Sequence, residues 1–155
     1  MIAKLLSCNY LITIGLFSWL LAQLIKVVGC FFRTKRLDWR KFFESGGMPS
    51  SHSAFVSAIT MGSALWYGVS SPSFSLALTL AAIVMYDAMG VRQAAGKQAK
   101  AINDIQMFLQ NSAVLLPEKV PALSCCKLQE SIGHKPIEVL GGALLGATIA
   151  VLTTL

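Results

Sequence analysis

Charged residues are scarce in this chain. They make up 13% of its 155 residues, whereas hydrophobic residues make up 55% and the mean hydropathy is +0.64. An ordinary soluble domain carries about 25% charged residues, so this composition excludes a typical soluble protein. A chain of this length forms one domain. We therefore expect a single membrane-embedded domain that covers residues 1–155.

Acidic residues are the scarcer of the two charge types. Seven aspartates and glutamates stand against thirteen lysines and arginines, which gives a net charge of +6. In a soluble protein this excess would suggest a nucleic-acid partner. In an apolar chain it indicates basic cytoplasmic loops and an affinity for anionic lipid head groups. We therefore expect membrane lipids as partners and no nucleic acid.

Cysteine is sparse and has no spacing typical of a zinc site. Cys8 and Cys30 fall in an apolar run, and Cys125 and Cys126 are adjacent in a loop. Adjacent cysteines rarely form a disulfide with each other, so we expect four reduced thiols, with palmitoylation of Cys125 or Cys126 as an alternative. We expect neither a metal nor a cofactor.

Long apolar runs are abundant, and they predict membrane-spanning helices. At about 1.5 Å per residue, the first run can cross a hydrocarbon core ~30 Å thick. It is too long for the hydrophobic region of a signal peptide, and it ends without a cleavage site of small residues. The expected spans are residues 10–32, 53–69, 74–91 and 136–155.

The segment between the third and fourth spans is the most polar part of the chain. Ile102, Ile105 and Leu109 recur there at helical spacing among polar residues, which predicts an amphipathic helix on the membrane surface. The expected fold is therefore all-α: a polytopic membrane helix bundle with four transmembrane helices plus an amphipathic surface helix. In the last span, Gly142 and Gly146 form a small-residue pattern that favours close helix packing.

The distribution of positive charge predicts the topology. Four spans place both termini on one side of the membrane, and eleven of the thirteen lysines and arginines lie at or between Arg33 and Lys135. The positive-inside bias places these loops in the cytoplasm and both termini on the opposite side. We expect an integral protein of a bacterial inner membrane or an organellar membrane.

A glycine-rich turn precedes the second span. Gly46, Gly47 and Pro49 make the turn, Ser50 is placed as a helix cap, and His52 lies in the first helical turn. The start of a helix favours anions, because its N–H groups are unpaired and the helix dipole is positive there. A histidine at this point can protonate the group that leaves the anion. The alternative is an ordinary capped turn with a hydrogen-bonded histidine.

The predicted topology gathers ionisable residues at the inner ends of the four spans. His134 and Glu138 are four residues apart, so the carboxylate can accept a hydrogen bond from one ring nitrogen and leave the other free as a nucleophile. An ordinary helix contact is the alternative for this pair. The other members are His52 and the group Lys26, Arg33, Asp87 and Arg92.

Three motifs in this set resemble those of the type-2 phosphatidic acid phosphatase and vanadium haloperoxidase superfamily. They are Lys26-x6-Arg33, Pro49-Ser50-Ser51-His52 and His134-x-x-x-Glu138-Val139-x-Gly141-Gly142. The stretches GGMPSSHSA (46–54), IVMYDAMGVR (83–92) and GHKP (133–136) resemble its divergent small membrane branch. The resemblance extends from about residue 24 to residue 150.

The resemblance implies catalytic roles for three residues. His134 would attack phosphorus and form a phosphohistidine, and Glu138 would stand where the family usually has an aspartate. His52 would protonate the leaving alcohol or phosphate.

The resemblance also implies a phosphate-binding set. Lys26 and Arg33 would hold phosphate oxygens, with help from Ser51. No arginine lies between Arg92 and His134, so Arg92 is assigned the place of the family's second arginine. Two further residues are expected to orient the site apart from the resemblance: Ser50, and Asp87, which has no counterpart in the family pattern and would orient Arg92 or Lys26 unless it contacts only water.

These expectations lead to a functional hypothesis. The chain would be a metal-independent membrane phosphatase that hydrolyses a lipid phosphate monoester or diphosphate at the cytoplasmic face. Phosphatidate, phosphatidylglycerophosphate and polyprenyl phosphates or diphosphates all fit. The alternatives are a catalytically lapsed protein that binds lipid phosphates and a proton-coupled carrier. A homodimer would bury more of so small a bundle.

Overall fold

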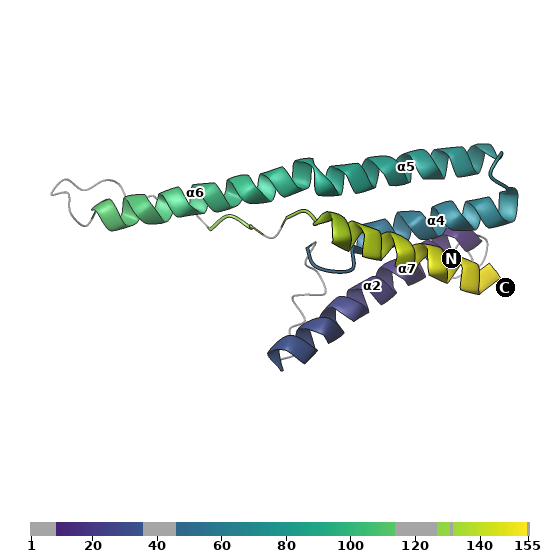
Figure 1. Ribbon diagram of the computed structural model, residues 1–155, viewed down its shortest axis with the longest axis horizontal. Coiled ribbons are helices and arrows are strands. Elements are labelled where there is room, and N and C mark those ends of the chain that lie inside the picture. Colours follow the sequence, from purple (N-terminus) through teal and green to yellow (C-terminus); the bar gives the residue numbers. More distant parts are fainter. Residues whose placement is uncertain (1–8, 36–45, 114–126, 131, 155) are drawn as a thin grey trace.

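The fold is described by a computed structural model of residues 9–35, 46–113, 127–130 and 132–154. In these ranges it is helical and has no strand (Figure 1). Side chains at Arg33 and at 110–113 are not described. The helices are α2 (Tyr10–Thr34), α4 (Ser51–Tyr67), α5 (Pro72–Met89), α6 (Val91–Ala113) and α7 (Pro136–Thr154).

The all-α prediction is confirmed. The helices α2, α4, α5 and α7 correspond to the four predicted spans, and their ends differ from the predicted ones by no more than two residues. Three helical stretches are long and apolar enough to cross a membrane: Tyr10–Phe32, Pro72–Leu109 and Pro136–Thr154. The fourth, α4, has 17 residues, or about 26 Å of helix.

Helix α4 is the centre of the bundle, because it packs against α2, α5 and α7. All but one of its buried residues are serine, alanine or glycine, so neighbouring helices approach its backbone closely. A Cβ atom at Gly142 would overlap the carbonyl oxygen of Ser50, and one at Gly146 would overlap that of Ala54. The two glycines therefore let α7 rest on the backbone of α4, as their spacing predicted.

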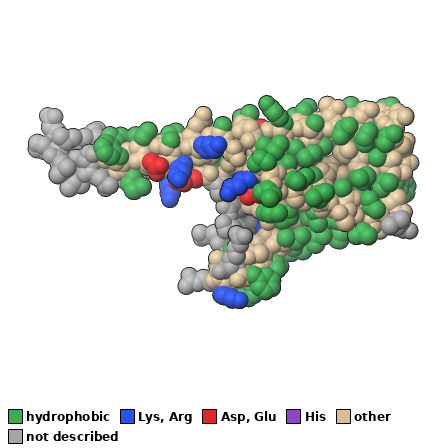
Figure 2. Space-filling view, in the orientation of Figure 1, with side chains coloured by type: hydrophobic (Ala, Val, Ile, Leu, Met, Phe, Trp, Pro, Cys, Tyr) green, Lys and Arg blue, Asp and Glu red, His purple; other side chains and the backbone are tan. Residues whose placement is uncertain are grey.

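The outward side chains of the bundle are apolar. Leu76 and Ile83 on α5, and Leu144 on α7, are all more than half exposed. Figure 2 shows hydrophobic side chains covering this surface, with charged side chains near the end where α6 leaves the bundle. So broad an apolar surface is typical of a protein surrounded by lipid.

The predicted amphipathic helix is present as α6, but its direction differs from the prediction. It continues in line with α5 instead of turning across the end of the bundle (Figure 1). Backbone hydrogen bonding explains this course, because the Gly90 N–H donates to Tyr86 and the Ala94 N–H donates to Gly90, each at 2.9 Å. The helical ladder thus passes through Gly90, and α6 projects beyond the bundle.

Two predictions concern residues outside the described ranges. The thiols of Cys8, Cys125 and Cys126 are among them, whereas Cys30 is described and is a free cysteine. The basic loop that begins at Arg33 also lies mostly outside these ranges.

Candidate functional site

The start of α4 is fixed by a serine cap and by a bond to α7. The Ser50 Oγ accepts hydrogen bonds from the Ser53 N–H at 3.3 Å and from the Ser53 hydroxyl at 2.9 Å. The Ser50 N–H donates to the carbonyl oxygen of Glu138 at 2.9 Å. Ser50 thus ties the first turn of α4 to the first turn of α7.

His134 lies in the segment before α7, and it is held by one contact to its ring and one to its backbone. Its Nδ1 lies 3.1 Å from Glu138 Oε2, and its backbone N–H donates to the carbonyl oxygen of Ala88 at 3.0 Å. The same carboxylate oxygen accepts the Lys135 N–H at 3.1 Å. A carboxylate on Nδ1 favours the tautomer with its proton there. The Nε2 lone pair is then available for chemistry.

Gly133 allows this arrangement. Its φ of +85° is in the left-handed region, and a Cβ there would collide with the backbone of Arg92 and Gln93. The Gln93 side-chain amide also donates to the His134 carbonyl oxygen at 3.4 Å. Sequence reasoning did not predict that Gly133, Gln93 and the Ala88 carbonyl hold His134 in place. Only the glycine next to His134 was a visible signal.

The two histidines and Arg92 lie around the same small cavity. Its volume is about 20 Å³, and it is lined by His52 from α4, Arg92 from α6, and Gly133 and His134 from the chain before α7. Val84 and Ala88 of α5 complete the wall. This is room for about one water molecule. Residues that are far apart in the sequence are thus brought together at the end of the bundle.

The environment of His134 favours its neutral form. Only 4% of its surface is exposed, and burial is the main cause that lowers its pKa below 6.5. The hydrogen bond that His134 Nδ1–H donates to Glu138 acts in the opposite direction, and the positive charges of Lys26 and Arg92 add to the lowering of the pKa. His134 precedes α7 and lies outside the spans, and its lowered pKa favours the neutral ring near pH 7.

Lys26 reaches the start of α4 from α2. Its Nζ donates to Ser51 Oγ at 3.4 Å, Lys26 is 7% exposed, and Ser51 is fully buried. A buried positive charge beside a helix N-terminus is an environment that favours an anion. The side chain of Arg33 lies outside the described part of the structure, so its phosphate-binding role stays a prediction.

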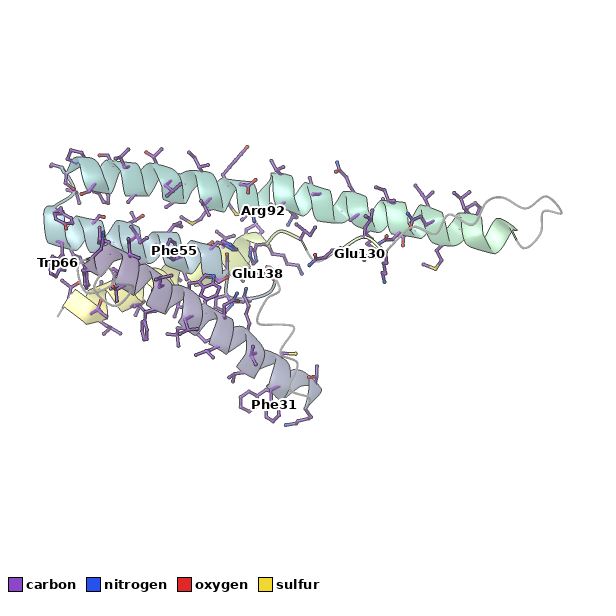
Figure 3. The ribbon with its side chains drawn as sticks, turned by 180° about the vertical axis from the view of Figure 1, so that it is seen from behind. Phe31, Phe55, Trp66, Arg92, Glu130 and Glu138 are labelled. Carbon is purple, nitrogen blue, oxygen red and sulfur yellow. The ribbon has the colours of Figure 1, made fainter. Side chains whose placement is uncertain are left out.

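Asp87 pairs with Arg92. The Arg92 Nε lies 2.6 Å from Asp87 Oδ2, and both side chains are partly exposed. Arg92 is thus the contact that Asp87 makes in the structure, and its orienting role stays a prediction. Figure 3 shows Arg92 and Glu138 near each other at the end of the bundle.

Two larger cavities flank this site and share Gly46, Gly47, Lys135 and Glu138 in their walls. One, of about 960 Å³, lies between α2 and α7, and Lys26 is among its lining residues. The other, of about 410 Å³, includes His134 and has Lys97 and Lys100 of α6 in its wall. Among the described residues, no group of three or more histidine, cysteine, aspartate or glutamate side chains could hold a metal ion.

The apolar helices and the polar site at one end define an integral membrane protein of the helical-bundle class. The model of the Divergent PAP2 family matches residues 7–149. The uncharacterized membrane protein YuiD of Bacillus subtilis (strain 168) is 41% identical over 145 residues, which is 91% of each chain. No solved structure matches the chain. The chain belongs to the Divergent PAP2 family, as its motifs indicated.

Proposed function

We propose that this protein hydrolyses a lipid phosphate monoester or diphosphate through a phosphohistidine intermediate. The observation that carries the proposal is the shared cavity of His52, His134 and Arg92. Membership of the Divergent PAP2 family supports the same chemistry. The polar end of the bundle would face the cytoplasm, because the described cations Lys26, Arg92, Lys97, Lys100 and Lys135 all lie there.

In the first step, the Nε2 lone pair of His134 attacks phosphorus. A phosphorus–nitrogen bond forms, and the bond between phosphorus and the lipid oxygen breaks. His52, which lines the same small cavity, gives a proton to that leaving oxygen. Glu138 keeps the His134 Nδ1 proton in place and stabilises the positive ring that forms.

In the second step, water hydrolyses the phosphohistidine. His52, now neutral, takes a proton from the attacking water while the phosphorus–nitrogen bond breaks. Inorganic phosphate leaves, and both histidines return to their starting states. One pair of imidazoles thus serves as nucleophile and as acid and base in turn.

The cations supply the electrostatic part of the mechanism. Phosphoryl transfer spreads negative charge over three oxygens, and fixed positive groups stabilise it. Lys26 and Arg92 would hold two of these oxygens, and Arg33 is the further predicted donor. The N–H groups in the first turn of α4, with the Ser51 hydroxyl, would complete the cradle.

The test is phosphate release by the detergent-solubilised protein from a panel of lipid phosphates. We expect release that vanadate inhibits, and we expect His134→Ala to abolish it. Thr148→Ala is the matched control, because Thr148 is an exposed residue of α7 whose hydroxyl donates to the Leu144 carbonyl oxygen of the same helix. Equal rates for His134→Ala and the unmodified protein would refute the proposal.

Phosphate binding without turnover is the second candidate function. It is favoured by the size of the cavity between the histidines, about 20 Å³, which is too small for a phosphate group unless the walls move. Vanadate or lipid-phosphate binding with no release of phosphate would support this function over hydrolysis.

A further inference from the structure

The chain returns to the bundle along one face of α6. We call residues 127–130 and 132–134 the return segment, and they form neither helix nor strand. Figures 1 and 3 show this segment beside α6, with Glu130 on it. The return segment ends at His134, so the contacts that fix the segment also fix the candidate nucleophile.

The face of α6 that meets the return segment is made of small and polar residues. Arg92, Gly96, Ala99 and Asn103 recur at intervals of four, three and four residues, so they lie on one side of the helix. Gly96, Ala99 and Asn103 are buried, although among the described helices α6 packs against α5 alone. The return segment contacts this face at Gly96 and Asn103.

Asn103 pairs with the backbone of the return segment. Its Nδ2 donates to the Leu128 carbonyl oxygen at 2.9 Å, and its Oδ1 accepts the Leu128 N–H at 3.0 Å. The Nδ2 also donates to Glu130 Oε1 at 2.8 Å. One amide side chain, which offers both donors and an acceptor, thus satisfies both backbone groups of Leu128. Because Asn103 is only 8% exposed, these groups would lose their partners if it were removed.

Gly96 brings the two backbones together. A Cβ atom there would lie 2.6 Å from the Ile132 carbonyl oxygen and 2.8 Å from that of Glu130. These are backbone atoms, which cannot rotate away as a side chain can. Alanine would strengthen α6 itself, because its helix propensity is higher than that of glycine. The glycine at this position therefore favours the contact with the return segment at the expense of the helix.

We propose that α6 positions the nucleophile: Gly96 and Asn103 set the path of the return segment and thereby hold the His134 ring at the cavity that it shares with His52. The contacts that Gln93 and Ala88 make with His134 complete the same path. The catalytic consequence rests on the proposed function. Attack on phosphorus depends on the place of Nε2, and a misplacement of about 1 Å can lower the rate ~10²-fold.

Gly96→Ala is the direct test, and Gln98→Ala is its matched control. Both substitutions add alanine to α6, but Gln98 is exposed and lies off the face that meets the return segment. Gly96→Ala should lower kcat ~10²-fold and leave KM nearly unchanged, because the groups proposed to hold the phosphate are retained. Gln98→Ala should change neither constant. An unchanged kcat in Gly96→Ala, or a loss seen only in KM, overturns the positioning proposal.

Asn103→Asp decides the question if thermal unfolding shows that Gly96→Ala does not fold. Aspartate keeps the shape of asparagine and the acceptor for the Leu128 N–H, but it loses the donor and places a second carboxylate beside Glu130. Asn103→Asp should lower kcat about tenfold, again with little change in KM. A kcat equal to that of the unmodified protein overturns the proposal.

A spectroscopic measurement separates this inference from the proposed function. The chain has two histidines, so the ¹⁵N-histidine NMR spectrum of a His52→Asn protein reports His134 alone. In that background Gly96→Ala should shift the ring signals of His134, and Gln98→Ala should not. Unshifted signals in Gly96→Ala overturn the positioning proposal and leave hydrolysis standing. Shifted signals, with no phosphate released by the unmodified protein, uphold the positioning and overturn the proposed function.

Discussion

At the scale of single residues, the properties of His134 follow from its burial and from one carboxylate. Burial lowers its pKa below 6.5, and Glu138 opposes part of that shift. The ring therefore stays neutral as the pH falls through 6.5 and takes up a proton only below its lowered pKa. The fold that buries His134 therefore keeps its ring neutral in mild acid.

This leads to a prediction on pH dependence. The acid limb of kcat/KM, which reports ionisations of the free enzyme, should lie below pH 6.5. Glu138→Gln should move that limb further down, because the carboxylate is the group that raises the pKa of His134. The same substitution should lower kcat ~10³-fold, since a glutamine amide at Nδ1 favours the wrong tautomer. The measurement is a pH–rate profile of both proteins with one substrate, so that the ionisation of the substrate cancels. An acid limb that rises in Glu138→Gln would contradict the assignment.

The ion pair of Asp87 and Arg92 permits a second prediction. Both side chains are partly exposed, at 37% and 51%, so their pairing contributes little to stability. Asp87→Asn should leave thermal unfolding nearly unchanged but lower kcat/KM about tenfold, because Arg92 loses the group that orients it.

A double-mutant cycle checks this role. If Asp87 acts through Arg92, then Asp87→Asn should have little further effect in an Arg92→Ala background. Additive losses would show that Asp87 acts independently. A fall in unfolding temperature that matches the loss of activity would indicate a structural role.

At the scale of elements, the contact of α7 with α4 determines how the motif that contains His52 lies against the motif that contains His134. Gly142 lies against the Ser50 carbonyl, and the Ser50 N–H bonds to Glu138. The cap of α4 and the first turns of α7 thus form one unit that spaces His52 from His134. Close packing of two backbones leaves no room for an added methyl group.

A third prediction concerns this contact. Gly142→Ala should destabilise the protein by about 1–3 kcal/mol, because the new Cβ collides with a backbone carbonyl that cannot rotate away. It should also reduce activity, since α4 and α7 must separate. Gly29→Ala is the control for stability, because its Cβ would enter open space. Thermal unfolding in detergent compares them, and equal unfolding temperatures would refute the packing argument.

Some features of the helices could be predicted from the sequence, and others could not. The helix bounds were predictable, because a membrane span requires an unbroken apolar run, and Ser50 was a recognisable cap. The spacing of His134 and Glu138 was enough to predict their contact. The direction of α6 was not predictable, because it depends on whether helical hydrogen bonds continue through Gly90. The hydrogen bond of His134 to the Ala88 carbonyl was not predictable either, since sequence patterns of side chains do not report backbone contacts.

At the scale of the whole molecule, the two ends of the bundle differ in chemistry. At one end the Tyr10 hydroxyl is 2.9 Å from the hydroxyls of both Thr153 and Thr154, and the Tyr10 ring stacks on Trp66 at 4.6 Å. The start of α2 and the end of α7 therefore lie on the same side. The histidines and the cations lie at the other end, which makes the molecule strongly asymmetric across the membrane.

This asymmetry gives the last prediction. From the positive-inside bias we expect the cationic end to face the cytoplasm, so a cysteine at Lys100 should be shielded from an impermeant thiol reagent in right-side-out vesicles and labelled in inside-out ones. A cysteine at Thr154 should give the opposite pattern. Both variants are made in a background with Cys8, Cys30, Cys125 and Cys126 changed to serine. Lys100 lines the cavity that also contains His134, so its labelling reports the side of the candidate site itself. Labelling of Lys100→Cys in right-side-out vesicles would place the site outside the cytoplasm, and the charge argument would be wrong.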